Sequence, residues 1–177
     1  MFSKIKLFDR HTANKNSSHY YLSVVISLSS VETAVWEMIT EAGGGYNIVG
    51  HSRKDLTDPD QIERLVTESI DEAGKDAGVD FEDAVFGLPN SWIDQEEILP
   101  SHEHLVDKLC KDLEIEPIAF VPIDSAVSYF LASKLGGPIT ANLVEVGYNK
   151  VSVSVINSGT VKYSQDLKKT TDIPQSV

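Results

Sequence analysis

Hydrophobic and polar residues alternate in two segments far apart in the chain, residues 21–38 and 141–165. In each segment an apolar run leads through a short polar turn into a run of strict alternation, such as Val151-Ser152-Val153-Ser154-Val155. Alternation with a period of two is typical of a strand with one buried face, and a short turn between two such runs indicates a β-hairpin. The pattern therefore predicts two similar hairpins, one near each end of the sequence.

The first hairpin is followed by a predicted strand and a predicted helix. Gly43-Gly44-Gly45 leads into an apolar run over residues 46–51. A glycine triplet can also form a phosphate loop, but this one enters a strand and not a helix N-terminus, which favours a simple turn. Asp58 and Pro59 then predict a helix start, and apolar residues at helical spacing continue to Gly78, which predicts the end of the helix.

Two further strand and helix pairs are predicted before the second hairpin. Strands are predicted at residues 83–89 and 118–122. Ser101 is predicted to cap the helix between them, and Asp124 to cap a third helix that ends at Leu135. The predicted order is βββαβαβα followed by a second βββ, which defines an α/β fold.

Composition and charge restrict the class of protein. The chain has 177 residues, of which 41% are hydrophobic, enough for a globular core. The net charge of −12 argues against a nucleic-acid partner, which requires clustered Lys and Arg. A single cysteine, Cys110, excludes a disulfide within the chain, and no run of about 18 apolar residues predicts a membrane span. These features favour a cytoplasmic location.

Four short segments carry a resemblance to a known superfamily: residues 21–31, 48–50, 85–92 and 145–147. With the predicted order of elements, they resemble the actin-like ATPases, and within these the FtsA/PilM branch of bacterial cell-division and type IV pilus assembly proteins. The resemblance implies a ribonuclease-H-like mixed sheet, three antiparallel strands plus parallel strands with helices, followed by the opening β-hairpin of a second actin-like domain. The expected division is given by residue number: a flexible basic leader 1–18, domain I at 19–138, the first strands of domain II at 139–166, and a linker or tail at 167–177.

The resemblance also implies two loops that grip the phosphates of ATP. The first matches residues 25–32, but Val25 replaces an acidic residue that manages the metal-bound water, and Glu32 stands where the family often has a lysine. The second retains Gly147, with Glu145 in place of an aspartate. The candidate nucleotide-binding residues that follow are Ser27, Ser29, Ser30, Glu145, Gly147, Asn149 and Lys150. No catalytic or metal-ligating residue is predicted.

One loop has a composition suited to docking a protein. Trp92 and Ile93 open a mostly acidic segment, residues 92–99, that mixes an aromatic with aliphatic side chains. Both residues are therefore candidate partner-binding residues. The alternative interpretation is that Trp92 covers the edge of a sheet.

Three functions remain open at this stage. The first is a non-catalytic or weakly nucleotide-binding scaffold or adaptor, a pseudo-ATPase of a cell-division or type IV pilus assembly platform, with no cofactor. Its partners would be other proteins of a membrane-associated assembly or a second copy of the chain. It would be located in the cytoplasm or at the periphery of the inner membrane. The second is an ATPase that binds ATP and Mg²⁺ with a further C-terminal half. The third is an unrelated α/β interaction domain.

Overall fold

The computed structural model of the protein describes residues 19–39, 44–79, 81, 83–94 and 97–168. The predicted basic leader 1–18, Gly43 of the predicted turn and the tail from residue 169 onward lie outside the described residues. The predictions made for them remain predictions.

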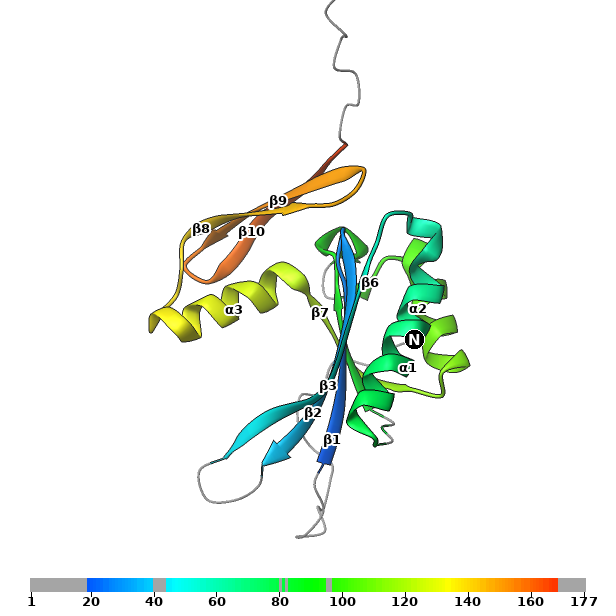
Figure 1. The fold of residues 1–177 in the computed structure, drawn as a ribbon. Coiled ribbons are helices and arrows are strands. Elements are labelled where there is room, and N and C mark those ends of the chain that lie inside the picture. The colour runs from blue at the N-terminus through cyan, green and yellow to red at the C-terminus, as the bar shows by residue number, and fades with distance from the viewer. Residues whose placement is uncertain (1–18, 40–43, 80, 82, 95–96, 169–177) are drawn as a thin grey trace, which may run out of the picture.

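A five-stranded mixed sheet forms the larger part of the fold, with the strand order β3-β2-β1-β4-β7. β1 (His19–Ile26), β2 (Ser30–Ile39) and β3 (Gly45–Asp55) pair antiparallel, whereas β4 (Asp83–Leu88) and β7 (Glu116–Pro122) run parallel to β1. Figure 1 shows this sheet nearly edge-on at the centre of the molecule. The predicted first hairpin and the ribonuclease-H-like order of strands are confirmed.

Two helices, α1 (Ile62–Ala77) and α2 (Pro100–Asp112), cover one face of this sheet (Figure 1). A short 3-10 helix, Pro59–Gln61, precedes α1, and the Asp58 carboxylate accepts a hydrogen bond from the backbone N–H of Asp60. Gly78 ends α1 in the left-handed conformation, with φ of 65°. Both ends of this helical segment were predicted from the sequence.

The core lies between the sheet and these two helices. Alternate residues of β1, β2 and β4 face α1 and α2 and are almost completely buried. Burial of each large aliphatic or aromatic side chain stabilises the fold by about 1.5–3 kcal/mol. The most deeply buried members are Leu22, Val24, Ile26, Val31, Val35, Val66, Phe86, Leu88, Val106 and Leu109.

α2 begins two residues earlier than predicted. Pro100 is its first residue, and the carbonyl of Leu99 accepts the backbone N–H groups of His102 at 2.8 Å and Glu103 at 3.0 Å. Ser101 is therefore inside the helix and exposed, so its predicted role as N-cap is wrong. The fixed φ of proline favours the first helical position, and here it outweighs the preference of serine for the cap.

The start of the third helix, α3 (Ile123–Leu135), also differs from the prediction. β7 enters α3 directly at Pro122, so Asp124 is the second helical residue and not the N-cap. Its side chain is only 3% exposed and turns toward the second sheet, where it accepts a hydrogen bond from Ser154. A tertiary contact therefore takes the carboxylate that the sequence assigned to a local cap.

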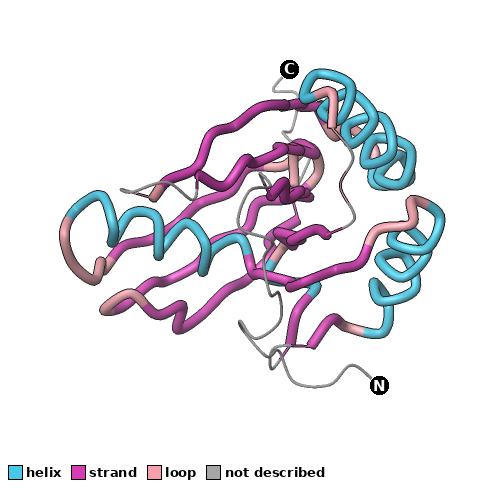
Figure 2. The backbone as a smooth tube through the Cα atoms, turned by 90° about the horizontal axis from the view of Figure 1, so that it is seen from below, coloured by secondary structure: helices cyan, strands magenta, loops and turns pink. Residues whose placement is uncertain are grey.

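The second predicted hairpin forms a separate three-stranded antiparallel sheet in the order β10-β9-β8. Its strands are β8 (Ala141–Val146), β9 (Lys150–Asn157) and β10 (Thr160–Lys168), so the last strand continues to Lys168. Figures 1 and 2 place α3 on the opposite side of the molecule from α1 and α2. A two-stranded hairpin that was not predicted, β5 (Ile93–Asp94) and β6 (Glu97–Ile98), lies between β4 and α2.

Candidate functional site

Two turns from the two sheets meet at one point. The first loop, residues 27–30, joins β1 to β2, and the second loop, residues 147–150, joins β8 to β9. Oε1 of Glu145, at the end of β8, accepts a hydrogen bond of 2.5 Å from the backbone N–H of Leu28. The fold thus brings together the two loops to which the sequence assigned the candidate nucleotide-binding residues.

The contact between the loops is close because the second loop contains a glycine. A Cβ built on Gly147 would lie 2.6 Å from both the Cβ and the carbonyl oxygen of Leu28. Real Cβ atoms essentially never approach so closely, so a side chain at residue 147 would push the loops apart. The retained glycine, predicted to let a phosphate approach, here lets the backbone of the first loop approach.

Every backbone N–H group of the first loop already has an acceptor within the protein. Ser27 N–H donates to the carbonyl of Ser30 at 2.8 Å, and Leu28 N–H donates to Glu145. The Ser27 hydroxyl oxygen accepts the N–H groups of Ser29 at 3.2 Å and Ser30 at 2.9 Å. Phosphate-binding loops direct such N–H groups at the anion. In this conformation the loop uses them to hold its own turn and the Glu145 carboxylate.

The second loop is held in a similar way. Gly147 N–H donates to the carbonyl of Lys150 at 2.9 Å, which closes the turn. Lys150 Nζ lies 2.8 Å from Oδ2 of Asp166 in β10, so this candidate nucleotide-binding lysine is paired with a carboxylate. Asn149, the remaining candidate in this loop, is exposed.

Three carboxylates lie where α3 meets the second sheet: Glu145 and Asp166 on the sheet and Asp124 on α3. Burial raises the pKa of Glu145, and the negative charges of Asp124 and Asp166 raise it further, although the hydrogen bond from Leu28 opposes them. Burial also raises the pKa of Asp124. For Asp166, burial disfavours the charged form, but the hydrogen bond from Lys150 and other donors outweigh it and hold the pKa below its ordinary value. The three carboxylates therefore differ: Asp166 is held in its charged form beside Lys150, whereas burial disfavours the charged forms of Glu145 and Asp124.

Serine hydroxyls connect these carboxylates to α3. The Ser154 hydroxyl donates to Asp124 and lies 2.8 Å from the Ser164 hydroxyl oxygen. Ser128 of α3 donates to the carbonyl of Gly159 at 3.0 Å. Polar contacts thus attach α3 to the second sheet, where an apolar core would be the ordinary means of attachment.

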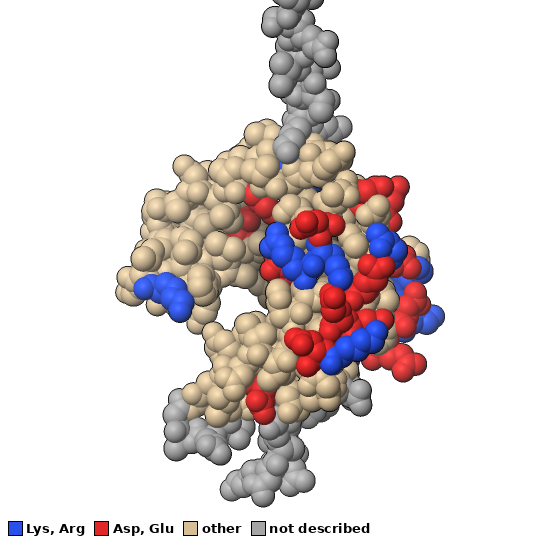
Figure 3. Space-filling view, in the orientation of Figure 1, with Lys and Arg blue, Asp and Glu red and all other residues tan. Residues whose placement is uncertain are grey.

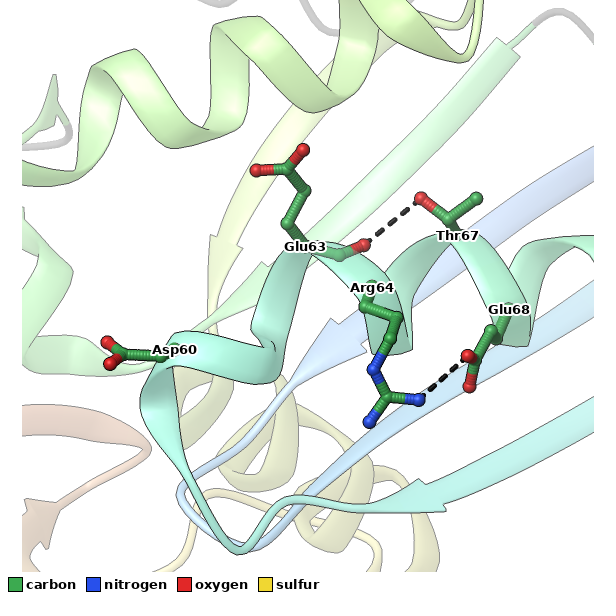
Figure 4. Close-up of a pocket in the computed structure, with 5 residues that line it drawn as sticks. All are labelled: Asp60, Glu63, Arg64, Thr67 and Glu68. Carbon is green, nitrogen blue, oxygen red and sulfur yellow. Dashed lines mark hydrogen bonds and ion pairs between the residues drawn. The ribbon is translucent and has the colours of Figure 1, made fainter.

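The described residues contain no group of three or more His, Cys, Asp or Glu side chains arranged to hold a metal ion. A surface hollow is lined by Asp60, Glu63, Arg64, Thr67 and Glu68, on α1 and the 3-10 helix before it (Figure 4). Its residues bind one another: the Arg64 side chain pairs with Glu68 at 2.7 Å, and the Thr67 hydroxyl donates to the backbone carbonyl of Glu63 at 3.0 Å. It lies on different elements from the two loops.

The predicted docking residues do not form an exposed pair. Trp92 is only 7% exposed and stacks on the imidazole of His102, with ring centroids 4.3 Å apart and ring planes within 6° of parallel. Ile93 is half-buried and packs against the same core. The prediction of Trp92 as an exposed anchor is wrong. A 3-10 turn, Asn90–Trp92, directs the indole inward against α2, where burial of its apolar surface is favourable.

Asp124, Asp166 and the serines of the second sheet were not among the predicted site residues. The predicted second hairpin ended at residue 165, although Tyr163, Gln165 and Leu167 alternate with Ser164 and Asp166 and so continue the strand pattern. That alternation could have extended the last strand. No local signal could have shown that the Leu28 N–H meets Glu145, because 117 residues separate them.

Comparison with known proteins gives matches at the level of structure. The sequence matches no protein-family profile and no curated protein. Ethanolamine utilization protein EutJ from Carboxydothermus hydrogenoformans is similar with a TM-score of 0.56, 14% identity, and coverage of 88% of this chain and 54% of EutJ. A chain of a PilM–PilN type IV pilus biogenesis complex is similar with a TM-score of 0.53, 12% identity, and coverage of 86% of this chain and 62% of that chain. A Bacteroides thetaiotaomicron protein of unknown function with an actin-like ATPase fold is similar with a TM-score of 0.51, 10% identity, and coverage of 87% of this chain and 72% of that chain.

These likenesses, with the strand order and the paired loops, define the class: the chain has the fold of the actin-like ATPases. The resemblance seen in the sequence is therefore confirmed for the fold, and PilM is among the proteins that share it. The chain spans less than two thirds of the length of the EutJ and PilM–PilN chains. No helix in the described ranges has the length and apolar character needed to cross a bilayer.

Proposed function

We propose that this chain is a non-catalytic actin-like domain that acts as a scaffold or adaptor in a protein assembly. The observation that carries the proposal is the hydrogen bond from Leu28 N–H to the Glu145 carboxylate, made by a first loop whose other N–H donors are already used. In effect a carboxylate of the protein takes the place that an anionic ligand would take at the first loop.

The chemistry of the neighbouring residues supports the same proposal. Phosphoryl transfer depends on a positioned metal ion and on donors that stabilise the developing charge. Val25 has no oxygen to hold a hydrated Mg²⁺, and Glu32 adds negative charge beside the first loop, where Ser30 and Arg53 hydrogen-bond to its carboxylate. ATP would have to displace Glu145.

The kind of assembly is proposed from similarity alone. One similar structure is named as a type IV pilus biogenesis complex, and the sequence resembles the FtsA/PilM branch. We therefore propose a role in a pilus or cell-division platform, in the cytoplasm or at the periphery of the inner membrane, with other assembly proteins as partners.

The second candidate is an ATPase, and one observation favours it: the two loops face each other across a short distance, and Gly147 is retained in one of them. In this alternative Glu145 would leave Leu28 when ATP and Mg²⁺ bind, and additional polypeptide would complete the site. The third interpretation, an unrelated α/β domain, loses its basis because the chain shares its fold with actin-like proteins.

Calorimetric titration of the full chain with ATP and excess Mg²⁺ separates the first two candidates. We expect only heats of dilution and no rise in melting temperature. Binding to the native state would be easy to detect, because a ligand at 100 times its Kd stabilises that state by about 2.7 kcal/mol. Saturable binding that Glu145→Gln strengthens, by removing the competing charge, would support the ATPase instead. Glu116→Gln, at an exposed glutamate of β7, is the matched control for loss of one charge.

A further inference from the structure

β3 is an edge strand of the five-stranded sheet, and half of it lacks the usual protection of an edge. Among the described strands only β2 pairs with it, so its outer side offers backbone N–H and C=O groups to a further strand. It has 11 residues, whereas natural edge strands are often very short. Its charged residues, which discourage pairing, are confined to positions 53–55, and residues 45–50 carry no charge. The uncharged half is therefore available to an additional strand.

The same half of β3 presents exposed apolar side chains on the face of the sheet away from α1 and α2. Tyr46 is 63% exposed and Ile48 is 54% exposed. The Tyr46 ring packs edge-on against Trp36 of β2, with ring centroids 4.9 Å apart, and so is held in place. In Figure 3 the charged side chains gather over α1 and α2, and the surface at this end of β2 and β3 is mostly uncharged. A strand that pairs here gains stability if its own side chains on this face are apolar.

We propose that residues 4–7 of this chain bind the first half of β3 as an additional antiparallel strand. These four residues alternate polar and apolar side chains, as a strand with one apolar face does: Lys4-Ile5-Lys6-Leu7. The resulting spatial order, leader, β3, β2, β1, is that of a Greek key, in which a fourth strand returns by a long connection to lie beside the far strand of three. The proposal is independent of the proposed scaffold function, since it uses neither loop.

The position of β1 allows the leader to return to this edge. His19, Met38 and Tyr46 lie in one row across β1, β2 and β3, so a strand beyond β3 would lie about 14 Å from β1, three strand spacings away. The connection, residues 8–18, can span up to about 36 Å. Figure 1 shows that β1 begins at the same end of the sheet as β3. A strand that reaches this end and then enters β1 therefore runs antiparallel to β3, and the flexibility predicted for the leader would be confined to the connection.

The alternation of residues 4–7 matches the faces of β3. A register with Leu7 opposite Tyr46 places Ile5 opposite Ile48, because antiparallel partners advance in opposite directions. Both aliphatic side chains then cover the exposed apolar side chains of β3 on the face away from the helices. Cross-strand apolar pairs of this kind are the ordinary unit of sheet stabilisation.

The opposite face of the added strand would meet acidic side chains of α1. The two lysines of residues 4–7 alternate with the aliphatic residues, so they lie on the face toward α1. Glu72 of α1 accepts a hydrogen bond from Ser52 of β3 and pairs with Lys54 at 2.6 Å, which places its carboxylate beside the edge strand. Asp76 follows Glu72 by one helical turn toward the start of β3 and is exposed. These carboxylates favour a strand that is basic on this face.

Tethering and charge favour the leader over other strands. Residues joined to β1 by a short connection have an effective concentration in the millimolar range at β3, which a second copy would reach only at high protein concentration. The leader contains four Lys or Arg residues and one Asp, whereas the whole chain has a net charge of −12, so the leader is attracted to the rest of the protein. The other edge of the sheet, β7, is less suited, because Pro117 and Pro122 have no N–H to donate.

Hydrogen exchange of β3 in the full chain tests the proposal. In the variant Ile5→Ser/Leu7→Ser the leader loses its apolar face, and exchange of residues 45–50 should become about fivefold faster or more, the ratio expected for loss of one net backbone hydrogen bond. Asn14→Ser/Asn16→Ser, in the connection, should exchange like the parent. Amides of α1 should be unchanged in every variant, which separates loss of docking from unfolding.

Disulfide formation gives a second measurement. In a Cys110→Ala background, Ile5→Cys and Ile48→Cys should form a bond within one chain under mild oxidation, because directly opposite residues place their Cβ atoms about 5 Å apart. Ile118→Cys, at an exposed position of β7, is the matched partner and should leave Ile5→Cys unpaired. Unchanged exchange in Ile5→Ser/Leu7→Ser, or equal disulfide yields at residues 48 and 118, would overturn the proposal. So would a disulfide that joins two chains, which would mean strand exchange between copies.

Discussion

Gly147 and Leu28 are in contact across the two loops, and there is no room for a side chain between them. A Cβ at Gly147 would lie 2.6 Å from the Leu28 carbonyl oxygen, which is a backbone atom and cannot rotate away. The neighbouring hydrogen bond, from Leu28 N–H to Glu145, holds the same loops together. These two contacts close the junction of the two sheets without any other ligand for the Leu28 N–H.

Gly147→Ala should destabilise the protein by about 1–3 kcal/mol, the usual cost of forcing extra atoms into a packed site. Urea denaturation at pH 7 measures the change in the free energy of unfolding. Gly137→Ala is the matched control, because a Cβ at that position would meet nothing within 4 Å. It should be neutral or slightly stabilising, through the reduced freedom of the unfolded chain. Equal effects of the two alanines would contradict the close contact.

Glu145→Gln should change how stability depends on pH. The folded state raises the pKa of Glu145 above its ordinary value of 4.5, so the folded protein binds this proton more tightly than the unfolded chain does. The contribution of Glu145 to stability is therefore greatest below pH 4.5 and is lost as the pH rises through the raised pKa. Glutamine keeps an oxygen to accept the Leu28 N–H but does not ionise.

The free energy of unfolding of the parent and of Glu145→Gln should be measured from pH 4 to pH 8. Relative to the parent, the variant should gain stability as the pH rises above 4.5. Asp124 and Asp166 titrate in both proteins, so most of their contribution cancels in the difference. Two curves that remain parallel across this range would show that the Glu145 carboxylate is not held in the site described.

Asp124→Ala should destabilise the attachment of α3 to the second sheet. The carboxylate is buried and accepts a hydrogen bond from Ser154, so its removal takes away one of the two partners of that buried hydroxyl, the other being Ser164. Loss of a buried hydrogen-bond partner costs about 1–3 kcal/mol. Hydrogen exchange of the α3 amides, compared with those of α1, should show faster exchange in α3. Ser125→Ala, at the adjacent exposed position, should leave both helices unchanged.

Trp92→Ala should act as a core substitution and not as the loss of a surface anchor. Truncation of a buried Trp costs about 3–5 kcal/mol, and the stack on His102 is lost with it. Thermal unfolding should show a clear fall in melting temperature. Tyr129→Ala removes an aromatic ring that is 80% exposed and should change stability by less than about 0.5 kcal/mol. A neutral Trp92→Ala would restore the interpretation of an exposed docking residue.

Local patterns predicted most elements of the fold but not the details of where two helices begin. The Asp58-Pro59 start and the Gly78 end of the first helical segment depend on neighbours in the chain, and the structure has both. Ser101 and Asp124 are residue types that cap helices, yet Pro100 takes the first helical position in one case and Ser154 takes the carboxylate in the other. Capping preferences amount to about 1 kcal/mol, so backbone geometry or one tertiary hydrogen bond can override them.

The sequence by itself determined the two alternating hairpins, the helices between them and therefore the actin-like order of elements, because each depends on periodicity within a short segment. The resemblance seen in the sequence also predicted that Val25 and Glu32 replace residues with which the family handles metal and phosphate. Only the tertiary structure decided that Glu145 binds the Leu28 N–H, that Trp92 is buried, and that the valines of β9 face outward while its serines face the loops. Those outcomes depend on which surfaces meet, and period-two alternation separates the two faces of a strand without saying which of them the rest of the molecule covers.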